Sequence, residues 1–367
     1  MNSTSTSPRP ATGCKSYYFS SNLADQHFPA DFYGLLITAA VLNSVTCPFV
    51  IFLNGLVIMA VKTKRRLQTN PNILLACLSI TDMLVGLIVQ PLHVTTAILL
   101  FLGKRFDEFC EVTLAFSVTF LILGGASFFH LPLISWERYF AIKHAFTHGN
   151  FVTKCRLMAA SALAWFVAVV TFTIPKLMFF FVIRQAATIS SIIVFQILVY
   201  RDARRHEKQI LAQHASLEAR AKFEKEKKAL KLTTIIISAV IVSYASPVII
   251  FAVTPRFADE ERYDDVKMAA RELAFLPVIL NSLINPIIYT VRSRQFRIAF
   301  IELLLRKGFQ EANAFERRLF GSNGNAVRPE ARHNGGGRER LARPHGSLFR
   351  RTRCAWISGI VANNEGG

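Results

Sequence analysis

The chain is poor in charged residues, and above all in acidic ones. Only 18% of its 367 residues are charged, with 24 Asp or Glu against 43 Lys or Arg, whereas 52% are hydrophobic. Together with a mean hydropathy of +0.34, this excludes an ordinary soluble domain and favours a polytopic membrane protein. The surplus positive charge lies in a few connections and in the tail. Loops flanking membrane helices explain such a distribution, so no nucleic-acid partner is expected.

Cysteine is scarce as well, and its positions exclude a disulfide framework. Cys47 and Cys77 lie inside apolar runs, and of the 6 cysteines only Cys14 and Cys110 could share an oxidising side. We therefore take Cys14–Cys110 as a candidate disulfide. The first 30 residues lack a basic segment followed by an apolar one. We expect no cleavable signal, and the first membrane helix would direct insertion.

The apolar residues gather in runs long enough to cross a bilayer, which requires about 20 residues. Between the fourth and fifth runs only Lys176 and Arg184 interrupt the apolar sequence. A single tilted helix with an interfacial segment is the alternative there, but the length of this stretch favours two spans. We expect an all-α membrane protein, a seven-transmembrane helix bundle over residues 34–293. The seven predicted spans are residues 34–61, 72–98, 109–140, 156–178, 180–202, 231–254 and 269–291.

The charges between the runs predict the orientation. The connection 201–231 holds ten Lys or Arg against five acids, whereas 255–272 holds six acids against four bases. By the positive-inside rule the N-terminal tail, residues 1–33, lies outside and the C-terminus lies in the cytoplasm. Asn2 begins a glycosylation sequon on that outer side. We expect a plasma-membrane protein.

Two further segments follow the last span. Residues 294–307 alternate apolar side chains with Arg294, Arg297, Glu302 and Arg306, which predicts an amphipathic eighth helix on the inner leaflet with these charges on its polar face. From residue 308 to 367, Gly, Asn, Arg and Ser are frequent, and we expect a disordered basic cytoplasmic tail.

A few polar residues interrupt the apolar runs. Glu137 and Arg138 end the third run, and Asp82 lies within the second. An ionisable residue at bilayer depth needs partners, protonation or a cation, so each marks a candidate functional site. For the Glu137–Arg138 pair the alternative is a helix end that snorkels to water. For each Asn or Ser the alternative is a hydrogen bond between helices, worth about 0.6 kcal/mol.

These residues occur together in an order that is typical of one family. Asn285-Pro286-Ile287-Ile288-Tyr289 closes the seventh run and precedes a short helix that contains Phe296. Over about residues 34–305 the pattern resembles the rhodopsin-like (class A) G-protein-coupled receptors. The subfamily is open, with a loose similarity to the melanocortin, adenosine and cannabinoid group. The residues that carry the resemblance are Asn54, Leu78, Asp82, Glu137, Arg138, Tyr139, Trp165, Pro247 and the stretch Asn285–Tyr289.

The resemblance implies two internal devices. Arg138, held by Glu137 at rest, would be the switch that meets a heterotrimeric G protein, and Tyr200 and Tyr289 would turn toward it on activation. A second group matches the family's sodium pocket and would hold an allosteric sodium ion; a water-filled polar network is the alternative. The switch residues are Glu137, Arg138, Tyr139, Tyr200, Asn285, Pro286 and Tyr289. The sodium or polar network residues are Asn54, Asp82, Ser127, Asn281, Ser282 and Asn285.

The chain also departs from the family pattern. Tyr244-Ala245-Ser246-Pro247 replaces the usual Cys-Trp-x-Pro, and Ile241 replaces a Phe one turn away. Ile192 stands in place of the Pro of the fifth helix. Lys227 stands where an acid often pairs with the switch Arg, so we expect raised signalling without ligand. A receptor-like protein with lost or atypical signalling is therefore an alternative.

The sequence limits the class of ligand mainly by excluding some classes. The position of the amine-binding Asp reads Phe120 and that of the retinal Lys reads Ile279, so neither a biogenic amine nor retinal is expected. Lys176 and Arg184 could meet an anionic or lipid head group, with interface snorkelling as the alternative. The ligand-pocket candidates are His93, Glu111, Phe116, Ser117, Phe120, Lys176 and Arg184.

The sequence thus predicts a receptor that binds an unidentified extracellular ligand and activates a heterotrimeric G protein, with arrestin and a receptor kinase as further partners. No nucleophile–base pair and no metal-ligating cluster suggests an enzyme or a cofactor other than the sodium ion. A transporter is the rival from another class. It is disfavoured because no internal repeat is found and only one acid lies at mid-bilayer depth.

Overall fold

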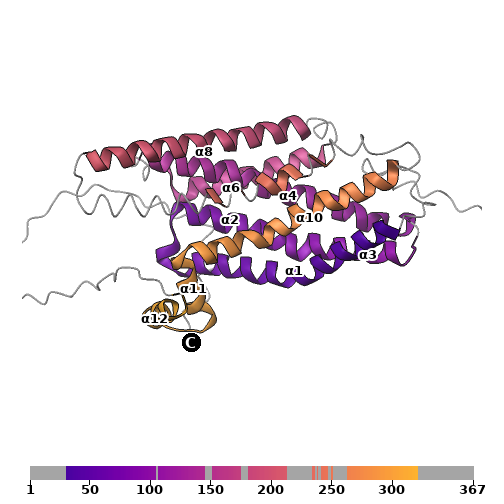
Figure 1. The fold of residues 1–367 in the computed structure, drawn as a ribbon, viewed down its shortest axis with the longest axis horizontal. Helices are drawn as coiled ribbons and strands as arrows, with labels where there is room; N and C mark the ends of the chain where they lie inside the picture. The colour runs from indigo at the N-terminus through magenta and orange to yellow at the C-terminus, as the bar shows by residue number, and fades with distance from the viewer. Residues whose placement is uncertain are drawn as a thin grey trace, which may run out of the picture. The chain divides into compact units, whose positions relative to one another are not determined.

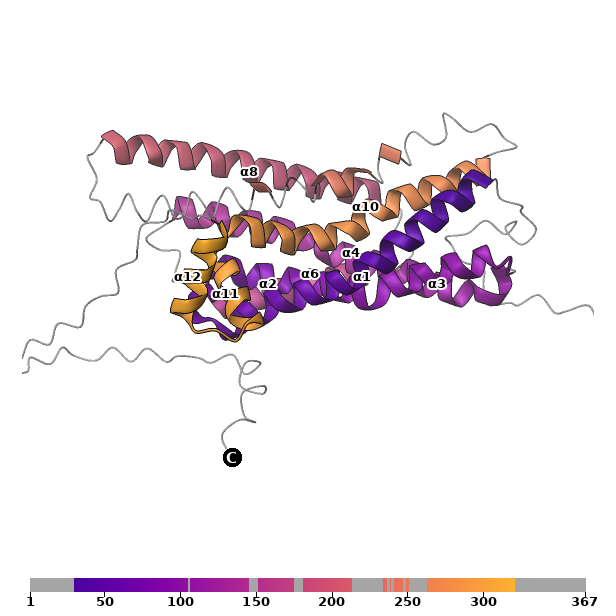
Figure 2. The ribbon, with the colours of Figure 1, turned by 60° about the horizontal axis from the view of Figure 1, so that its bottom comes forward.

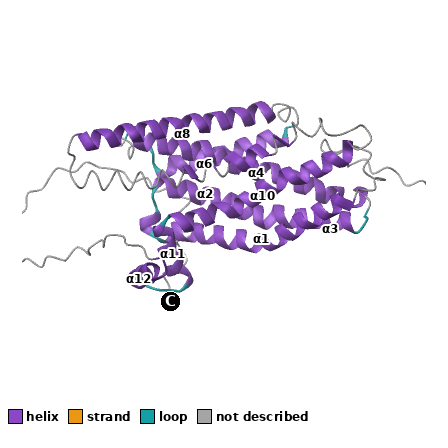
Figure 3. Cartoon of the chain, viewed as in Figure 1, coloured by secondary structure: helices purple, strands orange, loops and turns teal. Residues whose placement is uncertain are grey.

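The computed structural model describes residues 30–104, 106–144, 151–174, 181–212, 234–235, 238, 241–246, 249–250 and 263–320. Among these residues the only regular structure is helical, and no strand is present (Figure 3). The chain divides into two compact units, Met1–Asn313 and Ala314–Gly367, and the bundle belongs to the first.

Six of the described helical segments are long and apolar enough to cross a membrane. Within the first unit, the long helices lie side by side with their axes roughly parallel (Figure 1). Most of the predicted run 231–254 lies outside the described residues, although 241–246 is helical. The helices are α1 (Ala30–Thr63), α2 (Asn70–Leu84), α3 (Gln90–Phe101), α4 (Phe106–Lys143), α6 (Lys154–Thr173), α8 (Phe181–Ala212), α10 (Tyr263–Arg292), α11 (Arg294–Leu304) and α12 (Phe309–Phe320), with a short 3₁₀ turn, η2 (Arg65–Leu67), after α1.

Large apolar side chains cover much of the bundle's outside. Phe49 of α1 is 55% exposed, Phe166 of α6 is 63% exposed, and Ile197 of α8 is 59% exposed. Single exposed apolar residues are common in any protein, but rows of them along several parallel helices are costly in water. In a bilayer the same surface is solvated by lipid.

The interior is built where α1 packs against α2, α3 and α10, and where α4 packs against α2, α6 and α8. Figure 2 shows α1 and α10 running along each other. Val57, Leu78 and Leu131 from three of these helices are buried in one apolar cluster. Buried polar side chains lie on the same helices. The apolar packing between these helices therefore sets the positions of the polar side chains.

The second predicted span is one helix with an irregular centre. A π-helical turn, η3 (Val85–Val89), joins α2 to α3. Gly86 lies in this turn, and a Cβ on it would come within 2.9 Å of Val50. The wider turn and the missing side chain together let α1 approach closely, and Cys47 donates to the Gly86 carbonyl at 3.2 Å.

Some helix ends differ from the predicted ones. α6 ends at Thr173 rather than at residue 178, because Ile174 is extended (φ −99°, ψ 108°) and precedes Pro175, whose ring disfavours a helical residue before it. α8 continues to Ala212, ten residues beyond residue 202, where the predicted membrane span ends; the sequence also predicts that residues 202–230 extend this span as a helix, and the described part of that extension is helical. No proline or glycine stands between Arg201 and Ala212 to end it.

The expectation of disorder from residue 308 onward is wrong for Phe309–Phe320, which forms α12. The composition of the whole tail hides this segment, which has no Gly or Pro and repeats apolar residues at helical spacing. Residues 321–367 lie outside the described part of the chain.

The amphipathic helix after the last span is α11, but Glu302 does not lie on an exposed polar face as predicted. It is 6% exposed and pairs with Lys64 and Arg66, the latter at 2.9 Å. The basic residues that follow α1 thus clamp α11 through one buried carboxylate. Burial alone would raise the pKa of Glu302, yet hydrogen bonds from Lys64 and Arg66 and their positive charges hold the pKa below its ordinary value.

Replacing Glu302 by Gln should lower the melting temperature at neutral pH, by the equivalent of about 1–2 kcal/mol, since the two cations are partly exposed. A carboxyl with a depressed pKa stabilises the fold above its ordinary pKa, and this contribution is lost as the pH falls through the folded-state value. The difference between Glu302→Gln and wild type should therefore shrink below pH 4.5, the ordinary value for Glu. Melting curves in detergent at neutral pH and below pH 4.5 test this. A melting-temperature difference between variant and wild type that is equal at the two pH values would contradict the stabilising role of ionised Glu302.

Gly125→Ala should destabilise the bundle, whereas Gly124→Ala should be tolerated. A Cβ on Gly125 would lie 2.2 Å from the Phe172 ring of α6, but one on Gly124 would find its nearest neighbour at 3.7 Å. Overpacking of this kind costs about 1–3 kcal/mol. Paired melting curves of the two purified variants test the difference, and equal stability would mean that α4 and α6 are not in such close contact.

Candidate functional site

Asp82 is the centre of a buried polar network that joins α2 to α10. Its side chain is 0% exposed. Oδ1 accepts a hydrogen bond from Ser282 Oγ at 2.9 Å, and Oδ2 accepts one from Asn285 Nδ2 at 2.8 Å. Each carboxylate oxygen is thus satisfied by a residue about two hundred positions later in the chain, as an ionisable group at this depth requires.

Asn54 ties α1 into the same network for a reason that the backbone supplies. Pro286 has no N–H, so the carbonyl of Ser282, four residues earlier, loses its usual helical donor. Asn54 Nδ2 donates to this carbonyl at 2.9 Å and also to Val50 O at 2.9 Å. The proline of the Asn-Pro-x-x-Tyr motif therefore creates the acceptor that the buried asparagine satisfies.

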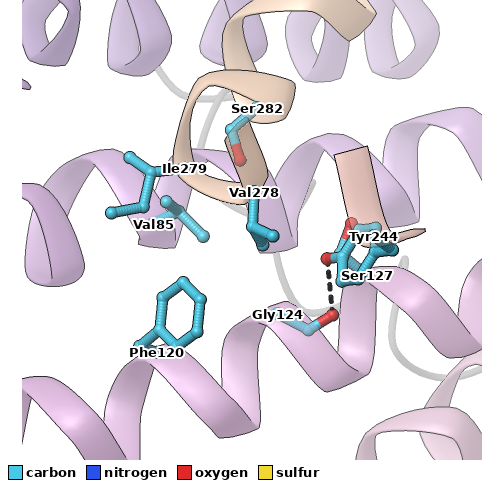
Figure 4. Close-up of a pocket in the computed structure, with 8 residues that line it drawn as sticks. All are labelled: Val85, Phe120, Gly124, Ser127, Tyr244, Val278, Ile279 and Ser282. Carbon is cyan, nitrogen blue, oxygen red and sulfur yellow. Dashed lines mark hydrogen bonds between the residues drawn. The ribbon is translucent and has the colours of Figure 1, made fainter. Parts of the chain in front are cut away.

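A small cavity lies beside this network. Figure 4 shows Ser127 and Tyr244 next to each other on one side of it and Phe120 on the other side, with Ser282 above. Tyr244 donates to the carbonyl of Gly124 at 2.7 Å. The aromatic residue at this level is thus a tyrosine bonded to the backbone of α4, which the sequence analysis noted only as a departure from Cys-Trp-x-Pro.

Several buried oxygen atoms around the network lack a hydrogen-bond partner among the described residues. They are the Oδ1 atoms of Asn54, Asn281 and Asn285 and the Oγ of Ser127. Asn281 is 1% exposed, but no hydrogen bond joins it to Asp82 in the described part of the chain. The structure thus brings Asp82, Ser282, Asn285 and Asn54 together, places Ser127 beside Ser282, and leaves Asn281 without a bond to the group.

The acid and base at the C-terminal end of α4 form an ion pair. Nε and Nη2 of Arg138 both lie 2.5 Å from Oε2 of Glu137. Glu137 is 0% exposed and Arg138 is 5% exposed. Side chains that snorkel to water would be exposed, so the geometry favours the buried pair over that alternative.

The three tyrosines predicted around the pair lie in different surroundings. Tyr139 accepts a hydrogen bond from Lys143 at 2.7 Å. Tyr289 is 0% exposed and lies against Phe296, with ring centroids 5.8 Å apart. Tyr200 is 58% exposed and lies under Arg204. Tyr200 is therefore not brought to Arg138 in this conformation.

Four of the ligand-pocket candidates are buried. They are His93 of α3 and Phe116, Ser117 and Phe120 of α4. The structure does not bring Glu111 to them, because it is an exposed residue near the start of α4. Lys176 lies outside the described residues, and so does the side chain of Arg184.

Sequence reasoning missed the partner of His93. Its Nε2 lies 2.8 Å from Oε2 of Glu272, and both side chains are buried. Glu272 was counted among the acids of the outer connection 255–272, although the predicted span 269–291 already includes it. In the structure it lies within α10 and is buried. A histidine in one apolar run and an acid at the edge of another were the available signal.

The remaining predictions concern positions that the structure describes only in part. Asn2, Cys14, Lys227 and Pro247 lie outside the described residues. Cys110 is disulfide-bonded. Its pairing with Cys14 stays a prediction, because Cys14 lies outside the described residues. Cys47 and Cys77 are free thiols. Within the described residues no group of three or more His, Cys, Asp or Glu side chains could hold a metal ion.

The geometry defines a class of protein. Parallel apolar helices surround a buried carboxylate network at their centre and an acid–base pair at the end of one helix. Such a bundle is a multi-pass membrane protein whose interior polar groups link its helices.

Comparison with known proteins gives the family. Residues 53–187 match the model of the "7 transmembrane receptor (rhodopsin family)". The 5-hydroxytryptamine receptor 2B of Dichotomyctere fluviatilis is 34% identical over 116 residues, which are 32% of this chain and 24% of that protein. The human 5-hydroxytryptamine receptor 2C is also 34% identical over 116 residues, 32% of this chain and 25% of that protein. The alpha-2B adrenergic receptor of Rattus norvegicus is 32% identical over 149 residues, 40% of this chain and 32% of that protein.

Residues 53–187 thus resemble the rhodopsin-like family of seven-transmembrane receptors, and the predicted all-α, seven-helix fold class is confirmed. The matches span about a quarter to a third of the relatives' own length.

Proposed function

We propose that the chain is a G-protein-coupled receptor of the plasma membrane, with the N-terminus outside and the C-terminus in the cytoplasm. An extracellular ligand would favour one arrangement of the helices, and that arrangement would open the inner face to a heterotrimeric G protein. Arrestin and a receptor kinase are the further partners that this role implies. The observation that carries the proposal is the buried Glu137–Arg138 pair at the end of α4.

The physics of this pair suits a switch. Removing one partner of a buried ion pair is costly, because the other charge stays buried. A G protein that offers Arg138 a new acceptor would offset this cost and stabilise the open state. The relatives' names concern 5-hydroxytryptamine and adrenergic receptors, but their ligands do not transfer directly, since Phe120 occupies the position of the amine-binding acid.

Arg138→Ala should abolish G-protein activation in cells without added ligand, at matched surface expression. Wild type should signal above empty cells, because Lys227 stands where an acid would otherwise restrain Arg138. Lys154→Ala is the matched control, since it removes an exposed positive charge near the start of α6 and should leave the signal intact.

Signalling that survives in Arg138→Ala would overturn the assigned switch. A wild type that is silent with every G-protein class, with and without ligands, would favour the alternative of a receptor-like protein with lost signalling. Movement of a solute that depends on Asp82 but not on Arg138 would favour the transporter.

We further propose that a sodium ion binds beside Asp82. The residues fit such an ion, because a carboxylate, a serine hydroxyl and asparagine carbonyl oxygens are the hard ligands that it prefers. The buried Oδ1 of Asn285, which lacks a hydrogen-bond partner in the described part of the chain, supports the proposal. An ion there would favour the conformation in which these helices stay together.

Sodium chloride should raise the melting temperature of the purified protein relative to choline chloride at equal ionic strength, and Asp82→Asn should remove this difference. Asp202→Asn on α8 serves as the control acid and should keep it. A sodium effect that is unchanged in Asp82→Asn would indicate that the group is a water-filled polar network instead.

A further inference from the structure

A hydrogen bond at the centre of the bundle joins the predicted sixth span, residues 231–254, to α4. Tyr244 Oη donates to the backbone carbonyl of Gly124 at 2.7 Å, the bond that Figure 4 draws beside the small cavity. Tyr244 is 7% exposed, and its ring centroid lies 4.8 Å from that of Phe128, also on α4. We call this contact the central tie.

The central tie resists separation of the two helices. A helical carbonyl oxygen that already accepts a backbone N–H has a second lone pair, so Gly124 can accept from Tyr244 while α4 stays intact. Lipid offers the tyrosine hydroxyl no other acceptor. Moving the sixth span away from α4 would therefore leave a buried hydroxyl unpaired, which is costly.

A second connection lies nearer the inner end of the bundle. Thr234 Oγ1 of the sixth span donates to Gln196 Oε1 of α8 at 3.2 Å, and Gln196 Nε2 donates to Ser135 Oγ of α4 at 3.4 Å. Ser135 Oγ in turn donates to the carbonyl of Leu131 at 2.9 Å. One glutamine amide thus links three helices. We call this chain of hydrogen bonds the inner tie.

The inner tie lies next to the acid–base pair of α4. Ser135 precedes Arg138 by three residues, which is about one helical turn. Arg138 is 5% exposed and bonded to Glu137. An acceptor from outside can reach the guanidinium only after the helices around this end of α4 have separated. Both ties oppose such a separation, the inner tie directly and the central tie about 21 Å further along α4.

We propose that Tyr244 and Gln196 are positioning residues for the switch: the two ties hold the sixth span against α4 and α8, and they break when the inner face opens. Both roles rest on the proposed receptor function, since they concern what restrains Arg138. Lys227 stands where an acid would otherwise provide this restraint, so uncharged hydrogen bonds supply it in this chain.

A purely structural role makes a different prediction. Hydrogen bonds between membrane helices are common, and a bond that is kept in both arrangements of the bundle stabilises both equally. Removing it would lower stability but would leave the balance between the closed and open arrangements unchanged. Removing a bond that exists only in the closed arrangement shifts this balance toward the open one.

Two variants remove one tie each with little change in volume. Tyr244→Phe keeps the ring and loses the hydroxyl, and Gln196→Leu loses the amide. Each should speed hydrogen–deuterium exchange of the backbone amides of residues 135–143 about threefold in the purified full-length protein, the factor that an average hydrogen bond between membrane helices represents. The double variant should reach about ninefold, because the ties lie far apart and their effects add in free energy.

The same variants should raise ligand-free G-protein activation in cells at matched surface expression, by up to about threefold each. General loss of packing would lower the signal instead. Thr234→Val should act like Gln196→Leu, because it removes the donor of the inner tie. Thr234→Ser keeps the hydroxyl and should behave as wild type.

Two serines provide matched controls on the same helices. Ser246 of the sixth span donates to the Ser243 carbonyl at 2.8 Å, and Ser191 of α8 donates to the Thr188 carbonyl at 2.7 Å. Each bond lies within one helix. Ser246→Ala and Ser191→Ala should therefore leave both the exchange of residues 135–143 and the signal unchanged.

Unchanged exchange in Tyr244→Phe and Gln196→Leu, or an equal increase in the two serine controls, would overturn the proposal. Faster exchange without a rise in signal would also overturn it, if Arg138→Ala abolishes the signal of the wild type. The exchange measurement needs no G protein. Faster exchange in a protein that never signals would therefore support the two ties and contradict the proposed receptor function.

Discussion

The bundle depends on one constraint: a carboxylate buried among apolar helices must be satisfied by groups from other helices. Asp82 receives its two hydrogen bonds from Ser282 and Asn285 of α10, and Asn54 of α1 satisfies the carbonyl that Pro286 leaves without a donor. The surrounding lipid cannot replace these partners, because it has no hydrogen-bond donors for the carboxylate. The network therefore fixes the register of α1, α2 and α10 more strictly than apolar packing does, because apolar contacts tolerate small shifts.

Two helices carry polar or aromatic groups at three levels of the bundle. α4 holds Phe116 against His93, Ser127 beside the central cavity and Arg138 at its end. α10 holds Glu272 beside His93, Ser282 and Asn285 at the centre and Tyr289 beyond them. A relative movement of α4 and α10 would change all three levels together. This is the physical basis on which a change at one level would influence the Glu137–Arg138 pair at the end of α4.

The structure explains how the bundle centre is packed where Tyr244-Ala245-Ser246-Pro247 replaces the family's usual Cys-Trp-x-Pro. Tyr244 donates to the Gly124 carbonyl, and the ring centroids of Tyr244 and Phe128 lie 4.8 Å apart. A tyrosine therefore links its helix to α4 at the place where the family usually has Cys-Trp-x-Pro. The neighbouring Gly125 admits Phe172 of α6. The missing Trp therefore does not leave the centre loosely packed, and a different aromatic contact stands there.

The sequence by itself determined the fold class, the approximate helices and the residues of the polar centre. Apolar runs of bilayer length and rare internal charges are local signals with few alternative explanations. Only the tertiary structure decided which of those residues meet. Glu272 contacts His93 of α3 inside the bundle although it was counted with an outer connection, and Glu302 is buried rather than exposed because Lys64 and Arg66 lie across from it. Tyr200 is exposed in this conformation, and the resemblance implies only that it turns toward Arg138 on activation. Such pairings depend on how each helix is rotated and which residues of other helices face it. The sequence pattern of a single helix carries no information on these neighbours.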